Sequence, residues 1–192
     1  MRDKIVLNFY QEIDRHLLEG AMVHDDLSTY FYFLELPGYG LLHEYHFLEE
    51  YGNYKSFYKY ALRMEGELLK QDNLGPPIEV IPAQWYGHNK ENIDAELKKK
   101  SILNGFDIWE KWETDTLAFY TEIYRKIYES NARYHLLAIV DELIKEVSEE
   151  IQFIKSEKNR LQSIGYDLSQ IFDWQKNFKK KKKGLYVDRF NQ

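Results

Sequence analysis

The stretch HLLAIVDELIKEVSEEIQFI, residues 135–154, decides the fold class. Its aliphatic side chains recur every three or four residues, so they share one face of an α-helix. They are Leu136, Val140, Leu143, Val147, Ile151 and Ile154. Gly165 is a natural C-cap for this segment. The pattern predicts a long amphipathic helix over roughly residues 132–164.

The same periodicity predicts three further helices, at about residues 4–36, 40–70 and 107–129. Pro37 and Gly38 end the first of them and leave room only for a tight turn. Because a tight turn reverses the chain, we expect the first two helices to be antiparallel neighbours.

The third helix is expected to start at Asp107, because Glu110 follows three residues later as in a capping box. Residues 72–104 precede it and hold most of the prolines, which exclude a continuous helix. A connection of this length can cross the bundle. The sequence therefore predicts an all-α, four-helix bundle over residues 1–165, with a long crossover between helices two and three. Residues 166–192 are expected to form a short amphipathic helix and a lysine-rich tail.

The charge distribution argues against a nucleic-acid-binding core. The net charge is −6, of which Lys179–Lys183 contribute +5 and the rest of the chain −11. We interpret the lysine run as a solvated tail and expect no nucleic-acid partner.

The absence of cysteine excludes disulfides and thiolate metal sites. The N-terminal residues lack the apolar core of a signal peptide, and no run approaches the roughly 18 apolar residues of a membrane span. These features predict a cytoplasmic protein that does not enter a membrane.

Several carboxylates fall on helix faces that should be apolar. Glu113 lies within the stripe of the third helix, Glu50 beside that of the second, and Glu146 and Glu150 flank that of the fourth. A carboxylate in a bundle core costs several kcal/mol unless it is paired, protonated or bound to a metal. Helical geometry instead turns other residues outward: Glu49, Glu142 and Glu149. Any one carboxylate at the edge of the core is more often half of an ion pair or a snorkelling side chain than a metal ligand.

Histidines accompany these carboxylates. His46 precedes Glu50 by four residues and shares its helix face, and His43 lies one turn before His46. On the first helix, His16 and His24 lie near the apolar stripe. The histidines add to the pattern of carboxylates, and carboxylate-rich sites suit hard, oxygen-loving cations.

Two segments resemble the ferritin-like superfamily. Residues 112–123 are similar to its third helix, where a lone Glu precedes a Glu–aliphatic pair, and residues 135–151 are similar to its Glu-rich fourth helix. The resemblance implies a di-iron or di-manganese carboxylate centre that oxidises Fe²⁺ or activates oxygen, possible ferroxidase chemistry. Glu50 and Glu113 would chelate or bridge the metals.

The remaining ligands implied by the resemblance are Asp25, Glu146 and either Glu149 or Glu150. The family spacing favours Glu149 and the helical geometry favours Glu150. Asp25 turns inward only if the first helix reorients after Gly20. The family's Glu-x-x-His is replaced here by Glu50-x-x-Asn53, so His46 would substitute as a ligand or one metal position is weakened.

A homo-oligomer is the expected assembly. The alternative function is a metal-free bundle that binds another protein through an exposed aromatic surface, such as Trp85 and Tyr86 in the crossover.

Overall fold

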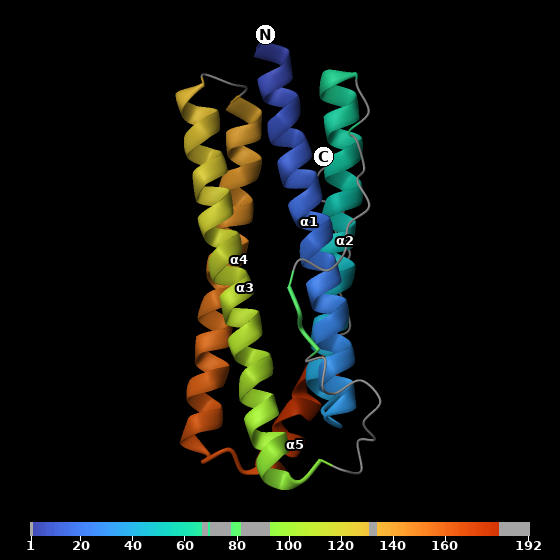
Figure 1. Cartoon of the computed structure of the whole chain (residues 1–192), viewed down its shortest axis with the longest axis vertical. Coiled ribbons are helices and arrows are strands. Elements are labelled where there is room, and N and C mark those ends of the chain that lie inside the picture. The colour runs from blue at the N-terminus through green and yellow to red at the C-terminus, as the bar shows by residue number, and fades with distance from the viewer. Residues whose placement is uncertain (1, 67–68, 70–77, 82–92, 131–133, 181–192) are drawn as a thin grey trace.

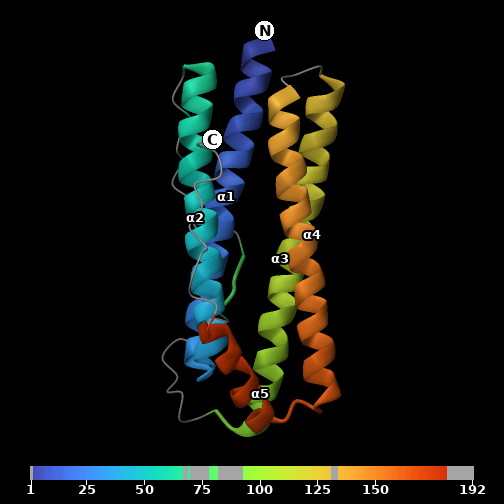
Figure 2. The same ribbon diagram turned by 180° about the vertical axis from the view of Figure 1, so that it is seen from behind.

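The computed structural model describes residues 2–66, 69, 78–81, 93–130 and 134–180. All regular secondary structure in these ranges is helical: α1 (Arg2–Phe33), α2 (Pro37–Glu65), α3 (Ala95–Glu129), α4 (Tyr134–Ser163), α5 (Leu168–Trp174) and the 3₁₀ helix η3 (Gln175–Lys180). The four long helices lie lengthwise beside one another, and α5 lies across one end (Figures 1 and 2). The prediction of an all-helical bundle with a short C-terminal helix is confirmed.

The first two helices form the expected antiparallel hairpin. Its turn uses a left-handed residue, Glu35 (φ 62°), and the amide of Leu36 donates to the carbonyl of Phe31 at 2.9 Å. Pro37 then occupies the start of α2, where a missing N–H costs nothing. Gly40 lets the hairpin close, because a Cβ there would lie 2.8 Å from the Tyr32 ring.

The third helix begins twelve residues before the predicted start at Asp107. Asp94 is the N-cap, and its Oδ1 accepts from the amide of Leu97 at 2.8 Å. The stripe of Trp109 continues upstream through the buried Ile102 and Phe106, so helix is favoured over this whole stretch. Asp107 is an exposed mid-helix residue.

The second helix ends earlier than predicted, at Glu65, with Gly66 in the left-handed conformation (φ 71°) as its C-cap. Helices α2 and α3 point in the same direction, so the connection joins opposite ends of the bundle (Figure 1). Of this connection, Leu69 packs in one core cluster and Val80 in the other. Trp85 and Tyr86, the alternative interaction surface, lie outside the described residues, as does the tail beyond Lys180.

The apolar interior is divided into two clusters along the bundle axis. One contains the start of α1, the end of α3 and the start of α4, with Phe9, Phe57 and Ile127 at its centre. The other contains the opposite ends of these helices, with Phe31 and Phe106. Between the two clusters lies a layer of buried polar side chains.

The C-terminal helices cover one end of the molecule. The amide of Gly38 donates to Oε1 of Gln175 at 2.8 Å, and a Cβ at Gly38 would lie 2.1 Å from the carbonyl oxygen of Gln175. This close approach places Phe178 of η3 against Tyr39, with ring centroids 5.3 Å apart. None of the described helices combines the length and the apolar run that crossing a membrane requires.

Candidate metal centre

The polar layer between the two apolar clusters receives side chains from all four long helices. They are His24 from α1, His43, His46 and Glu50 from α2, Glu113 from α3, and Glu150 from α4. The layer therefore depends on the complete bundle rather than on one sequence motif.

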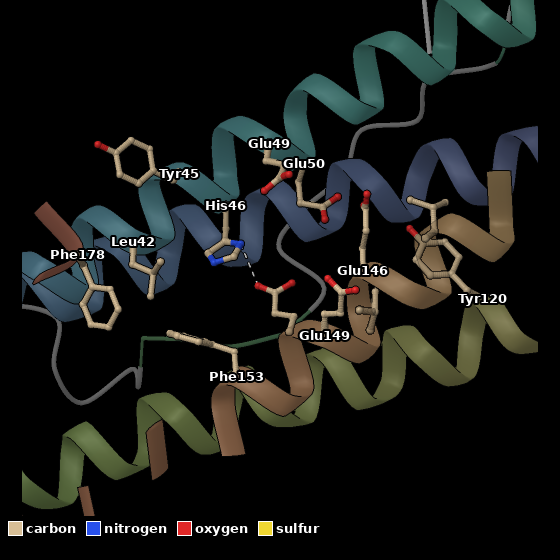
Figure 3. Close-up of a pocket in the computed structure, with 13 residues that line it drawn as sticks. Leu42, Tyr45, His46, Glu49, Glu50, Tyr120, Glu146, Glu149, Phe153 and Phe178 are labelled. Carbon is tan, nitrogen blue, oxygen red and sulfur yellow. Dashed lines mark ion pairs between the residues drawn. The ribbon is translucent and has the colours of Figure 1, made fainter. Parts of the chain in front are cut away.

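His46 and Glu150 form a direct contact between α2 and α4. The His46 Nδ1 lies 2.9 Å from Oε1 of Glu150, shown as the dashed line in Figure 3. The ring of His24 stacks on that of His46 with centroids 5.0 Å apart. Each of these three residues offers one ligand atom, and the three atoms lie within 4.8 Å of one another.

His24 also makes two contacts on its inner side. Its Nδ1 lies 3.0 Å from Nδ1 of His43, and its Nε2 lies 3.5 Å from Oε1 of Glu113. All three residues are buried, with exposed fractions of 1%, 0% and 3%. Oε1 of Glu113 and Nε2 of His43 have no hydrogen-bond partner among the described residues. Buried polar atoms without partners are rare in folded proteins and mark positions that an additional ligand can satisfy.

Burial keeps His24 and His43 neutral. It lowers the pKa of His24 to about 3, and it lowers the pKa of His43 well below the ordinary value. The neighbouring imidazoles act in the same direction. Neutral imidazole is the form that binds metals, so these rings need not lose a proton first.

The two carboxyl groups behave in opposite ways. Burial raises the pKa of Glu113 well above its ordinary value, and the charges of Glu150 and Glu50 add to the effect. Burial also disfavours ionised Glu150, but the charge and hydrogen bond of His46 outweigh this and hold its pKa below the ordinary value. Glu150 is therefore favoured in its anionic form, whereas Glu113 retains its proton more strongly than an ordinary glutamate.

Trp109 belongs to the second apolar cluster and lies next to these carboxyl groups. Its indole N–H lowers the pKa of both Glu113 and Glu150, although Nε1 reaches full hydrogen-bond geometry with neither. Its ring contacts His43 edge-on, with centroids 4.3 Å apart.

A cavity of about 320 Å³ adjoins the layer between α2 and α4. Glu49 and Glu50 face Glu146 and Glu149 across it (Figure 3). Its other end is apolar and is lined by Leu42, Phe153 and Phe178. His46 and Glu150 also line the cavity.

Six of the seven predicted site residues gather at this layer or its cavity. They are His46, Glu50, Glu113, Glu146, Glu149 and Glu150. Asp25 does not join them: α1 continues as a helix past Gly20, so Asp25 stays exposed on the outer face. Glu49 and Glu149 were expected to point outward, but both line the cavity, because glutamate side chains at the edge of a helix face can reach inward.

Sequence reasoning did not select His24 and His43 as site residues. His24 fills the one gap in the α1 stripe, between Gly20 and Leu27 at the spacing of a helix face, and this signal could have identified it. His16 lies elsewhere: its ring stacks between Trp112 and Phe119, and its Nε2 contacts Thr116 at 3.0 Å.

No protein-family model matches this sequence, and no curated protein matches it. The chemistry of the site must therefore be argued from its own residues.

Proposed function

We propose that this protein binds a divalent transition-metal ion inside its helical bundle, with His24, His46 and Glu150 as ligands. The observation that carries the proposal is the convergence of three potential ligand atoms within 4.8 Å, supplied by three different helices.

The distances support this proposal. Two ligands at about 2.0–2.1 Å from one ion lie about 3 Å apart when they subtend a right angle. The His46 and Glu150 ligand atoms are already 2.9 Å apart. Nδ1 of His24 contacts His43, so Nε2 is its available nitrogen. A shift of Nε2 of His24 by roughly 1 Å toward the ligand atoms of His46 and Glu150 would complete a three-residue ligand set.

The donor types favour a metal of intermediate hardness. Two imidazoles and one carboxylate suit Fe²⁺, Mn²⁺, Co²⁺ or Zn²⁺ better than Mg²⁺ or Ca²⁺, which prefer oxygen ligands. Three protein ligands leave at least one coordination position open, as in catalytic rather than purely structural sites. Because His46 and Glu150 line the cavity, that position would face it.

A two-ion centre that oxidises Fe²⁺ or activates oxygen is the more specific proposal. The support for it is the set of further carboxylates around the cavity, in which Glu50 and Glu146 lie across from each other (Figure 3). Glu113 lies behind them, close enough for Glu50 to raise its pKa. Metal titration would give two ions per chain if this proposal is correct and one if only the histidine site binds. In the two-ion case, Glu50→Ala should lower the stoichiometry to one and abolish Fe²⁺ oxidation.

Thermal melts with Fe²⁺, Mn²⁺, Co²⁺ and Zn²⁺ test metal binding directly. A ligand that binds only the folded state at 100 times its Kd stabilises it by about 2.7 kcal/mol, which corresponds to about 5–10 °C in Tm for a chain of this size. His46→Ala and Glu150→Ala should lose this shift. The matched control is Glu142→Ala, an exposed position on α4. A wild-type protein whose Tm responds to none of the four ions would refute the proposal.

A further inference from the structure

His43 is the most buried histidine of the layer, and its position suggests a role for it that rests on the proposed metal site. Its exposed fraction is 0%, and its ring stacks parallel to Phe31 at 5.3 Å. Among the described residues, its one polar contact is the 3.0 Å approach of its Nδ1 to Nδ1 of His24. It is therefore fixed in place and positioned to act through His24.

Two neutral imidazole nitrogens at 3.0 Å can form a hydrogen bond only if one carries the hydrogen and the other is bare. Both rings are buried, with exposed fractions of 1% and 0%, and a charged imidazole is costly in such a place, so each ring carries a single hydrogen. The tautomers of His24 and His43 are consequently linked. When Nδ1 of His24 carries a hydrogen, Nδ1 of His43 does not, and the hydrogen of His43 is then on its Nε2.

We propose that His43 is a positioning residue that sets the tautomer of His24, and that metal binding at Nε2 of His24 switches the tautomers of both rings. The metal-free and metal-bound states favour opposite arrangements of the same hydrogen bond.

In the metal-free state, Nδ1 of His43 donates to Nδ1 of His24. The hydrogen of His24 is then on Nε2, 3.5 Å from Oε1 of Glu113, a polar neighbour. Nε2 of His43, which has no partner among the described residues, is left as a bare acceptor. The reverse arrangement would place a buried N–H at this atom, and orphaned donors are the rarer and less favourable case.

In the metal-bound state, Nε2 of His24 must be bare to act as a ligand. The hydrogen of the bond therefore moves from Nδ1 of His43 to Nδ1 of His24. His24 releases its Nε2 hydrogen, and His43 gains one at Nε2, both by exchange with solvent. The two rings together keep the same number of hydrogens, so the switch adds no net proton release. His24 then donates from the ring nitrogen that is not bound to metal, as metal-binding histidines generally do.

Long-range ¹H–¹⁵N correlation spectra of the full chain can identify both tautomers, using Zn²⁺ as a diamagnetic probe. Without Zn²⁺, we expect hydrogen at Nε2 of His24 and at Nδ1 of His43. With saturating Zn²⁺, we expect hydrogen at Nδ1 of His24 and at Nε2 of His43. Finding His24 already protonated at Nδ1 without Zn²⁺ would overturn the switch.

Two variants separate positioning from packing. His43→Phe keeps a ring against Phe31 but removes the nitrogen, and should weaken Zn²⁺ binding roughly 10–100-fold. His43→Asn offers its side-chain oxygen as an acceptor near the same place, so it should recover most of the affinity and hold His24 with hydrogen at Nδ1 even without Zn²⁺. His16→Phe, at a histidine stacked outside the layer, is the control and should bind Zn²⁺ like the wild type.

The outcomes distinguish the two proposals. If the wild type binds no Zn²⁺ or other tested ion, the metal site itself is refuted, and this inference with it. If the wild type binds Zn²⁺ and His43→Phe binds it equally tightly, the metal site stands and the role of His43 is refuted.

Discussion

Two polar clusters in the described part of the bundle differ in how completely their atoms are paired. The first joins α2, α4 and α5. Tyr39 and Trp174 both donate to Oε2 of Glu157, at 3.1 Å each, and Arg160 donates to Glu157 at 2.9 Å and to Tyr39 at 2.7 Å. Arg160 also lies over the Trp174 ring, 4.3 Å from its centroid.

The second cluster is the polar layer of His24, His43, His46, Glu50, Glu113 and Glu150. Here Nε2 of His43 and Oε1 of Glu113 have no hydrogen-bond partner in the described part of the chain. A fully paired buried network stabilises a single arrangement, whereas a partly paired one costs free energy. We infer that the Glu157 cluster serves the fold and that the histidine layer serves a ligand.

The largest expected effect comes from breaking the Glu157 cluster. Glu157→Ala leaves Arg160, Tyr39 and Trp174 without their shared acceptor, and should lower the free energy of unfolding by about 3 kcal/mol. Urea unfolding at neutral pH measures this. A loss below about 1 kcal/mol would show that the cluster is not the structural element inferred here.

Asp14 offers a third case for this comparison, a buried carboxyl group that lies beside the first apolar cluster and outside both polar clusters. Burial raises its pKa from 3.8 to about 7, and Lys55 opposes this only partly. Since the folded state then holds the proton more tightly than the unfolded state, stability falls as the pH rises from about 4 to 7 and stays low above that. Asp14→Asn should be more stable than the wild type by about 1–2 kcal/mol at about pH 8 and lose this advantage near pH 4. Thermal melts of the two proteins between about pH 4 and 8 measure this difference in stability. A difference that stays constant over the range would contradict the expectation.

A smaller change in the free energy of unfolding, opposite in sign to that at Glu157, is expected for Glu113 in the polar layer. Because burial raises the pKa of Glu113, its neutral form is favoured, and Glu113→Gln imitates that form. The metal-free variant should match the wild type or exceed it by up to about 1 kcal/mol, increasingly so as the pH rises. Glu157→Gln, the matched change in the paired cluster, should be destabilised. The contrast between the clusters would be wrong if the two glutamine variants lost the same stability.

The smallest effect on stability is expected for an ion-pair group at the surface between α3 and α4. Lys158 on α4 contacts Asp107 and Glu110 on α3 at 2.6 and 2.5 Å. Lys158→Ala should cost about 0.5 kcal/mol at low salt, and the difference should disappear in about 1 M NaCl because exposed charges are screened. A salt-independent loss would indicate that the lysine stem contributes through packing instead.

Periodicity was sufficient to predict the four long helices, because each buries a stripe set by helical geometry. It could not fix the start of α3, since the local resemblance of Asp107 and Glu110 to a cap competes with an apolar stripe that extends back to Ile102. The carboxylates of the site were largely predicted because charges on apolar stripes are conspicuous. The approach of His24 to His43 was not predicted from the sequence. It depends on how α1 and α2 are rotated about their axes relative to each other, which no local pattern encodes.

The polar layer draws its side chains from two pairs of helices. All three of its histidines and Glu50 lie on α1 and α2, whereas Glu113 and Glu150 lie on α3 and α4. An ion held by His24, His46 and Glu150 would therefore act as a cross-link between the two pairs, in addition to the connection that joins α2 to α3. A chain divided within that connection would become a two-piece protein whose reassembly depends on metal concentration, so that association of the pieces would report how tightly the site holds its ion.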